Sequence, residues 1–326
     1  MTIFRDILCV LDTAEDCTPA LDRAVSLAEN NQANLTVVDV VEKITLRFAV
    51  PAASSVFSDL QPKMVAARTQ ELDALVEPYR QRIPINTQVL TGTRFLEIIR
   101  EVLGGKHDLV IKMPEKLTWL ERLFGSDDMN LLRMCPCPVW LVKPQKKKSY
   151  GCILAAVDVY DEYPPEELEI QYRLNQEILA AAASLALSEF AELHIVYAWH
   201  ARSESAMRGA YMHTTEAEID AYLEQERRRH EVNLEALTRE ISNEQGQDRV
   251  DYLKPKTHLL KGWARKEIPA MAKELTADVI VMGTVARTGI PGIIMGNTAE
   301  TILNQIDCSV LAIKPPGFET PVKVKN

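Results

Sequence analysis

Glycines and small polar residues late in the chain could bind an anion. Gly283 follows a buried apolar run, where glycine can turn with positive φ and bring backbone amides close to a ligand. Gly296, Asn297 and Thr298 stand at an expected helix start, which offers unpaired N–H groups to a negative charge. Asn297 is also a good helix N-cap, so capping alone would explain it. The pattern predicts a phosphate-binding loop or, more simply, a capped helix.

The residue patterns of common enzymes and metal sites are missing. The chain has no GxxxxGK[ST], GxGxxG or GxSxG motif, so we expect a non-catalytic protein. A slow ATPase is the remaining enzymatic alternative, but nothing visible would position its attacking water. His194 and His200 flank a strand end without a third ligand. His230 lies at the margin of an apolar helical stripe, where a histidine is usually packed. We therefore expect no metal site.

Composition and charge narrow the remaining functions. A net charge of −9 argues against binding to nucleic acid or anionic membrane, because such surfaces need excess Lys and Arg. The sequence shows no signal-peptide features and no apolar stretch of membrane-spanning length, so we expect a cytoplasmic protein. In that compartment Cys135 and Cys137, spaced CxC, should be reduced thiols at small buried or half-buried positions, with metal binding as the second interpretation.

An internal repeat supplies the elements that must position the loop. The segment from Val89, VLTGTRFLEIIREVLGGKHDLVIK, aligns with HLLKGWARKEIPAMAKELTADVIVM from His258, so that Gly92 falls on Gly262 and Asp108 on Asp278. The segments ILCVLD, ANLTVVDVVE and CPVWLVKP recur in the same order as LAAVD, AELHIVYAWH and CSVLAIKP. Duplication of one domain is the simplest explanation.

Each copy alternates short apolar runs with helix-period segments, which is the pattern of a parallel sheet buried on both faces. In the first copy, strands are predicted at 4–11, 34–41, 85–91, 108–112 and 138–143, and helices at 18–30, 60–82, 94–104 and 126–134. The second copy has a longer helix, predicted at 215–241. The expected fold is therefore α/β, with two tandem five-stranded parallel-sheet, Rossmann-like domains.

The expected sheet locates the ligand site. In an open parallel sheet, ligands bind outside the carboxyl ends of the strands, where strand order reverses. The informative loops of the second copy therefore follow its first strand, which ends near Asp158, and its fourth strand, which ends near Gly283.

The loop resembles the phosphate-binding loop of the universal stress protein family. ATP-binding members carry G-x-x-G, nine further residues, then G with Ser or Thr. Gly283 and Gly296 match the first and last glycines, whereas Ala286 replaces the middle glycine and Asn297 the hydroxyl residue. An alanine where positive φ is needed costs on the order of 1 kcal/mol. The resemblance implies that ATP or a related nucleotide binds weakly in the second domain.

The same resemblance implies further binding residues. The family places an aspartate near the adenosine, matched by Asp158, and a residue lining the adenine, matched by Ala198. Val157, Met282 and Thr298 stand beside the matched positions and complete the predicted set.

In the first copy the loop departs further from the family pattern. Met113 and Lys116 replace the first two glycines, and Pro114 removes a backbone donor. Asp127 and Asp128 place negative charge where a phosphate would approach. The expectation is a degenerate loop in a structural partner domain.

The runs GTVARTGI, GNTAETIL and KHDLVIKM and the ending IKPPGFETPVKV resemble the tandem universal stress protein E branch of proteobacteria. This likeness implies a role in stress survival, including DNA-damage resistance. It also implies an intramolecular pseudo-dimer formed through the strands PVWLVK and SVLAIK, and a homodimer of chains. The predicted domains are 1–144 and 150–316, with a tail at 317–326.

Two alternatives use no nucleotide. The chain would then be an interaction protein with empty pockets, or the first copy would hold a hydrophobic metabolite under the apolar stretch FAVPAASSVF, residues 48–57.

Overall fold

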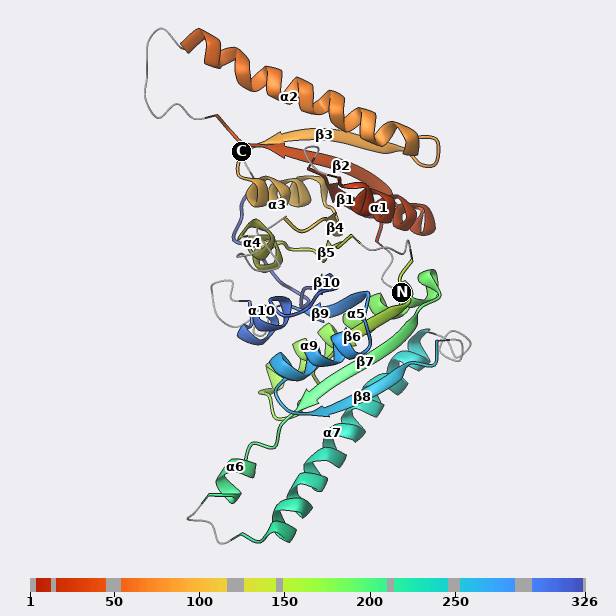
Figure 1. The fold of residues 1–326 in the computed structure, drawn as a ribbon, viewed down its shortest axis with the longest axis vertical. Coiled ribbons are helices and arrows are strands. Elements are labelled where there is room, and N and C mark those ends of the chain that lie inside the picture. Colours follow the sequence, from red (N-terminus) through yellow and green to blue (C-terminus); the bar gives the residue numbers. More distant parts are fainter. Residues whose placement is uncertain are drawn as a thin grey trace.

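The strands of both halves of the chain form one ten-stranded sheet (Figure 1). The structure is a computed structural model that describes residues 4–12, 16–44, 54–115, 126–144, 149–209, 214–245, 253–284 and 295–324. The strand order is β3-β2-β1-β4-β5-β10-β9-β6-β7-β8. Neighbouring strands run parallel within each half, and β5 and β10 meet antiparallel. The expected tandem α/β fold is confirmed.

The first half contains β1 (Asp6–Val10), α1 (Thr18–Asn31), β2 (Asn34–Val41), α2 (Ser54–Val76), a short 3₁₀ helix (Glu77–Tyr79), β3 (Ile85–Thr91), α3 (Arg94–Gly105), β4 (Leu109–Lys112), α4 (Ser126–Met134) and β5 (Val139–Leu141). The ends of these strands differ from prediction by at most two residues. The predicted helix 60–82 is wrong at its ends. It begins earlier, and Pro78 ends it by removing a backbone donor.

The second half contains β6 (Cys152–Ala156), α5 (Pro165–Glu189), β7 (Glu192–Trp199), α6 (Glu204–Met207), α7 (Glu216–Gln245), β8 (Lys256–Lys261), α9 (Ala264–Glu274), β9 (Val279–Gly283), α10 (Asn297–Leu303) and β10 (Ser309–Ile313). The long helix α7 begins at a capping box. The Glu218 amide donates to Thr215 Oγ1 at 3.3 Å, and the Thr215 amide donates to Glu218 Oε2 at 2.8 Å.

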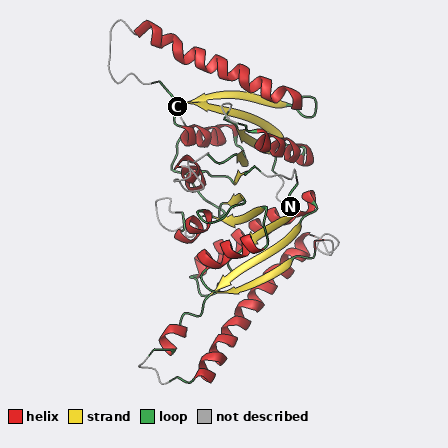
Figure 2. Cartoon of the chain, viewed as in Figure 1, coloured by secondary structure: helices red, strands yellow, loops and turns green. Residues whose placement is uncertain are grey.

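Helices cover both faces of the sheet (Figures 1 and 2). On one face, buried side chains of α1, α2, α5 and α7 share a core with the strands, and on the other face those of α3, α4, α9 and α10 do so. The buried residues of the central strands β1, β6 and β9 are therefore all apolar rather than alternating, and those of β4 are apolar up to its last residue, Lys112. None of the described helices is long and apolar enough to span a bilayer.

Equivalent hydrogen bonds confirm the repeat. Asp108 accepts the amides of Arg5 and Asp6, and Asp278 accepts those of Gly151 and Cys152. Each aspartate thus fixes the start of its domain's first strand beside the fourth strand. Gly92 and Gly262 likewise have φ angles of +151° and +149°, which favours glycine at both turns.

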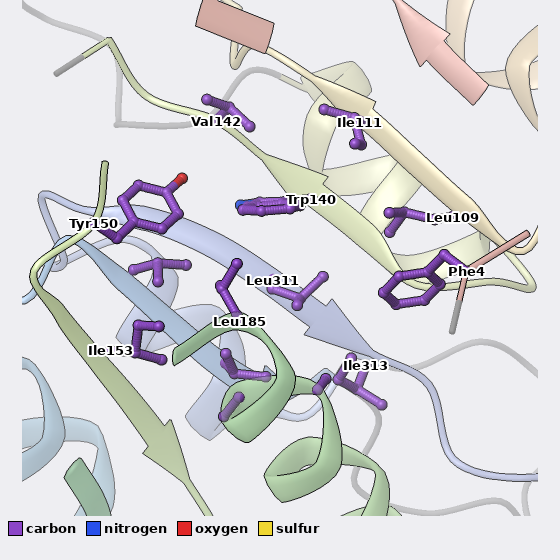
Figure 3. Packing of buried hydrophobic residues seen from close by; sticks show 14 of the residues in the cluster. Phe4, Leu109, Ile111, Trp140, Val142, Tyr150, Ile153, Leu185, Leu311 and Ile313 are labelled. Atoms are coloured by element: carbon purple, nitrogen blue, oxygen red, sulfur yellow. The ribbon is translucent and has the colours of Figure 1, made fainter. Parts of the chain in front are cut away.

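The two halves join through β5 and β10. Trp140 stands opposite Leu311 in the antiparallel register, and both side chains are buried. Figure 3 shows Trp140 and Tyr150 packed with Leu311 and Leu185 across this junction. Arg23 of α1 pairs with Glu189 of α5 and lies 4.0 Å over the Tyr150 ring. The predicted pseudo-dimer through these two strands is confirmed.

In each half, a lysine shortly after the last strand reaches into the other half. Lys314 is buried after β10, and its ammonium donates to the carbonyls of Leu132 and Arg133 at the end of α4. Lys143 after β5 donates to Asp307 Oδ1 at 3.0 Å, beyond α10. A cation at a helix C-terminus is favoured by the unpaired carbonyls and the helix dipole. These contacts of the two lysines therefore link the two halves.

Lys314 should make the stability of the protein depend on pH. Burial lowers the pKa of its ammonium to about 8, below its ordinary value. Between roughly pH 8 and pH 10, the folded state has released this proton while the unfolded state still holds it. We expect the free energy of unfolding to rise over this range in the wild type, relative to Lys314→Met. Urea denaturation at pH 7, 8, 9 and 10 measures the difference, and parallel profiles would contradict the prediction.

Candidate functional site

A cavity of about 370 Å³ opens at the carboxyl ends of β6, β7 and β9. It lies where the strand order of the second half reverses, between β6 and β9. Its wall consists of Ala156, Val157, Asp158, Tyr160, Tyr163, Gln171, Leu174, Ile178, Tyr197, Ala198, Trp199, His200, Arg202, His230, Trp263, Ala264, Arg265, Ile268, Met282, Gly283, Thr284, Gly296, Thr298, Ala299 and Ile302. Its volume falls in the range of small-molecule sites.

Most of the residues predicted from the sequence line this cavity. They lie after β6, near the end of β7, at the end of β9 and at the start of α10, and they are Val157, Asp158, Ala198, Met282, Gly283, Gly296 and Thr298. Asn297 begins α10 but is not part of the wall. Ala286 lies outside the described residues.

Two details of the predicted loop are wrong. Gly283 is the last residue of β9 and does not have positive φ. A Cβ atom there would lie 2.8 Å from Leu174 Cδ2, so close packing against α5 favours glycine. The N-cap of α10 is Gly296 rather than Asn297, and it makes no side-chain capping bond. Glu300 of this helix has its carboxylate 3.1 Å from Arg133 of the first half.

Asp158 is held by its own loop. Its Oδ2 accepts the Tyr163 hydroxyl at 2.8 Å, and its Oδ1 accepts the Tyr160 amide at 3.1 Å. The buried Asn175 side chain bonds both the amide and the carbonyl of Asp158. Burial raises the pKa of the Asp158 carboxyl, and the two donors partly oppose that shift. This carboxylate is a fixed acceptor facing the cavity.

An aromatic cluster forms one wall. His230 of α7 lies between Tyr197 and Trp199, with ring centroids 5.4 and 5.5 Å away. Tyr160 and Tyr163 meet edge to face with centroids 4.9 Å apart. Burial lowers the pKa of His230, which favours the neutral ring. The expected packing of His230 is confirmed, but its place in the cavity wall was not predicted, because it depends on how α7 crosses β7.

The start of α10 is partly free. The Gly296 amide donates to the Thr284 carbonyl at 3.2 Å. Among the described residues, the amides of Asn297, Thr298 and Ala299 have no hydrogen-bond acceptor. The Thr284 hydroxyl accepts a hydrogen bond from the Lys314 ammonium at 3.1 Å and donates one to the Leu132 carbonyl. Thr284 in the cavity wall is thus supported by α4 of the first half.

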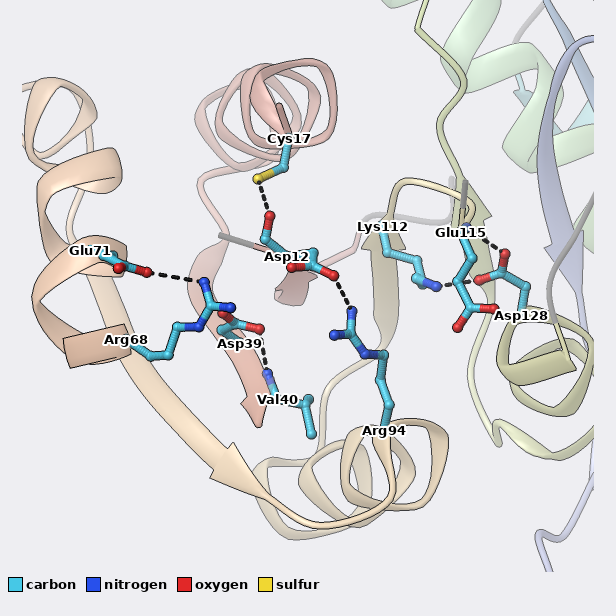
Figure 4. Close-up of polar contacts among 10 residues, drawn as sticks. All are labelled: Asp12, Cys17, Asp39, Val40, Arg68, Glu71, Arg94, Lys112, Glu115 and Asp128. Carbon is cyan, nitrogen blue, oxygen red and sulfur yellow. Dashed lines mark hydrogen bonds and ion pairs between the residues drawn. The ribbon is translucent and has the colours of Figure 1, made fainter. Parts of the chain in front are cut away.

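The same place in the first half is filled by ion pairs (Figure 4). Arg94, the first residue of α3, donates to Asp12 at 3.0 Å, whereas Ala264 begins α9. Lys112 pairs with Asp128, and both side chains are buried.

The second half has apolar residues at the positions of that buried pair. Met282 occupies the strand position of Lys112, because each pairs with the last residue of its domain's first strand. Ala299 is the third residue of α10, as Asp128 is of α4. Of the two acidic residues predicted for the first loop, Asp128 is therefore neutralised internally by Lys112, where the second half has apolar residues.

Other candidate groups do not assemble a metal site. Within the described ranges, no three His, Cys, Asp or Glu side chains are grouped to hold a metal ion. His194 Nδ1 lies 2.8 Å from His258 Nε2, and His200 stacks on Trp263 at 4.1 Å. Cys135 and Cys137 are buried as expected, with sulfurs 3.6 Å apart. The apolar stretch 48–57, considered as a cover for a metabolite in the first copy, lies outside the residues whose side chains are described.

Comparisons of this chain with known proteins agree on one family. The profile described as Universal stress protein family matches residues 3–143 and 174–314. Universal stress protein E of Escherichia coli K12 is 29% identical over 330 residues, covering 100% of this chain and 99% of that protein. A protein of unknown function from Pseudomonas aeruginosa PAO1 has a solved structure with a TM-score of 0.65, 26% identity, and coverage of 96% of this chain and 93% of its own. A universal stress protein solved in complex with cAMP is 19% identical, with a TM-score of 0.35 over 44% of this chain and 100% of its own.

The buried pair in the first half predicts a sharp response to substitution. Asp128→Ala leaves the Lys112 ammonium buried without its carboxylate, which should cost about 3–5 kcal/mol of unfolding free energy. The double variant Lys112→Met with Asp128→Ala copies the second half and should recover most of that loss, because no charge is left unpaired. Urea denaturation of both variants measures the difference. A loss below about 1 kcal/mol in the single variant would show that the pair is not needed.

Proposed function

Because this chain belongs to the universal stress protein family, as two tandem copies of its domain, we propose a cytoplasmic, non-catalytic stress protein that binds an adenine nucleotide weakly in its second domain. The observation that carries this proposal is the cavity that gathers Asp158, Ala198, Gly283 and Gly296 at the switch point of the sheet. Likeness to universal stress protein E over the full chain supports a role in stress survival, with DNA-damage resistance as the proposed outcome.

Each part of the cavity suits a part of the ligand. Ala198, Met282 and the aromatic cluster give an apolar surface for a base, and the Asp158 carboxylate can accept hydrogen bonds from an amine or ribose hydroxyl. The free amides of α10 favour an anion. One amide is already used by Thr284, and neither Ala286 nor Asn297 follows the family's loop pattern, so weak binding of ATP or a related nucleotide is expected.

The first domain acts as a structural partner in this proposal. Its Asp12–Arg94 and Lys112–Asp128 pairs occupy the equivalent position, which favours a nucleotide-independent interaction role for that half. We assign residues 1–144 and 150–316 to the two domains and 317–326 to a tail, and we expect two chains to form a homodimer.

A single substitution tests the ligand site. Ala264→Arg places in the second domain the arginine that faces Asp12 in the first domain as Arg94. The new guanidinium should pair with Asp158 and enter the cavity, and so reduce ATP affinity by about tenfold or more. Isothermal titration of the full-length protein with ATP measures the change.

Lys266→Arg is the matched control, because residue 266 lies on the same helix and its side chain is 82% exposed. It should bind ATP as the wild type does. Absence of ATP binding to the wild type at millimolar concentration would refute the proposed function, and unchanged binding by Ala264→Arg would refute the location of the site.

A further inference from the structure

We propose that Arg202 and Arg265 bind the anionic group of the ligand, and that the ligand is an aromatic ring joined to a compact phosphate, of the nucleoside monophosphate class. This inference rests on the proposed function of the second-domain cavity. It moves the charge-binding surface away from the glycine loop, to the loop after β7 and the first turn of α9. We call these two arginines the cationic rim.

The charges of the cavity wall favour an anion. Arg202 and Arg265 both line it, and Asp158 is the only carboxylate among the lining residues described. That carboxylate already accepts the Tyr163 hydroxyl and the Tyr160 amide. The wall is therefore a local cationic surface on a chain whose net charge is −9.

The two rim arginines differ from most other arginines of the second domain. Arg173, Arg208, Arg227, Arg228 and Arg229 each form ion pairs with carboxylates. In the described part of the chain, Arg202 and Arg265 form none within 4.0 Å. Glu162 is near enough to Arg202 for the two charges to interact, but its oxygens already bind the Tyr160 hydroxyl and the Arg229 guanidinium. The rim guanidinium groups thus keep their donors for another partner.

Aromatic rings hold the rim arginines in place. The Arg202 guanidinium carbon lies 4.5 Å from the centroid of Tyr160, and that of Arg265 lies 5.5 Å from the centroid of Trp263. A cation over a ring face is attracted by the ring, and this contact leaves its N–H donors available for hydrogen bonds. Two oriented guanidinium groups fit the oxygens of one phosphate in a bidentate manner.

The rings behind the rim suit a planar ligand. His200 stacks on Trp263 at 4.1 Å, and Trp199 and Tyr197 continue the wall inward to His230. Base-on-aromatic stacking needs such faces and tolerates different bases. A planar ring held by this wall would lie in the same cavity that Arg202 and Arg265 line.

The start of α10 offers less to a charge. α10 has only seven residues, Gly296 provides no side-chain donor, and its amide already bonds Thr284. A full positive charge attracts a phosphate more strongly than the partial charge of a helix end, which is equivalent to about half a unit.

Titration of the full-length protein with adenosine, AMP and ATP tests the assignment. We expect AMP to bind about tenfold more tightly than adenosine, and ATP to gain little beyond AMP. The double variant Arg202→Gln with Arg265→Gln should bind AMP as weakly as adenosine and leave adenosine affinity unchanged. Arg239→Gln is the matched control. Arg239 is exposed on α7 and does not line the cavity, and within the described part of the chain its side chain donates to the Glu235 carbonyl alone.

The outcomes separate the two proposals. If adenosine, AMP and ATP bind equally, or if the double variant keeps the advantage of AMP, the cationic rim is wrong while the nucleotide site stands. If ATP binds far more tightly than AMP in both proteins, the charge lies at the glycine loop and the rim is again wrong. If none of the three binds, both proposals fail.

Discussion

The antiparallel pairing of β5 with β10 is the constraint on which the rest of the molecule depends. Each domain alone would present a short apolar strand, VWL or SVLAI, with unpaired backbone groups at the edge of its sheet. Pairing satisfies those groups and buries Trp140 against Leu311. It also brings Lys314 to α4 and Thr284 to Leu132, so a residue in the wall of the second-domain cavity is held by the first domain.

The two copies show how one fold can either keep or fill the same space. The strand ends, the Gly92 and Gly262 turns and the Asp108 and Asp278 contacts are retained in both. The difference lies in a few side chains that point across the carboxyl edge of the sheet. In the first domain opposite charges meet there, whereas in the second domain small or apolar side chains leave a cavity bordered by rings.

The sequence predicted the architecture well because its signals are local and repeated. Central strands buried on both faces read as continuous apolar runs, and the two copies could be checked against each other. The strand-end residues Asp158, Ala198 and Gly283 could be placed at one edge by topology alone. Residues that act across elements could not. Lys112 gave no sign of its partner Asp128, and His230 reaches the cavity only through the path of α7. The role of Gly283 was misread because the approach of Leu174 is a tertiary contact.

The position of β10 near the end of the chain has a consequence for biosynthesis. β5 leaves the ribosome early, but the strand that covers it is made only after the whole second domain, and Lys314 emerges later still. Until β10 and Lys314 have been synthesised, the nascent first domain therefore has an open sheet edge, and the carbonyls of α4 lack their lysine cap. Domains generally fold as units during translation, and unpaired edges are sites of misassembly. The short length of β5, three residues, limits this hazard by offering little template to another chain.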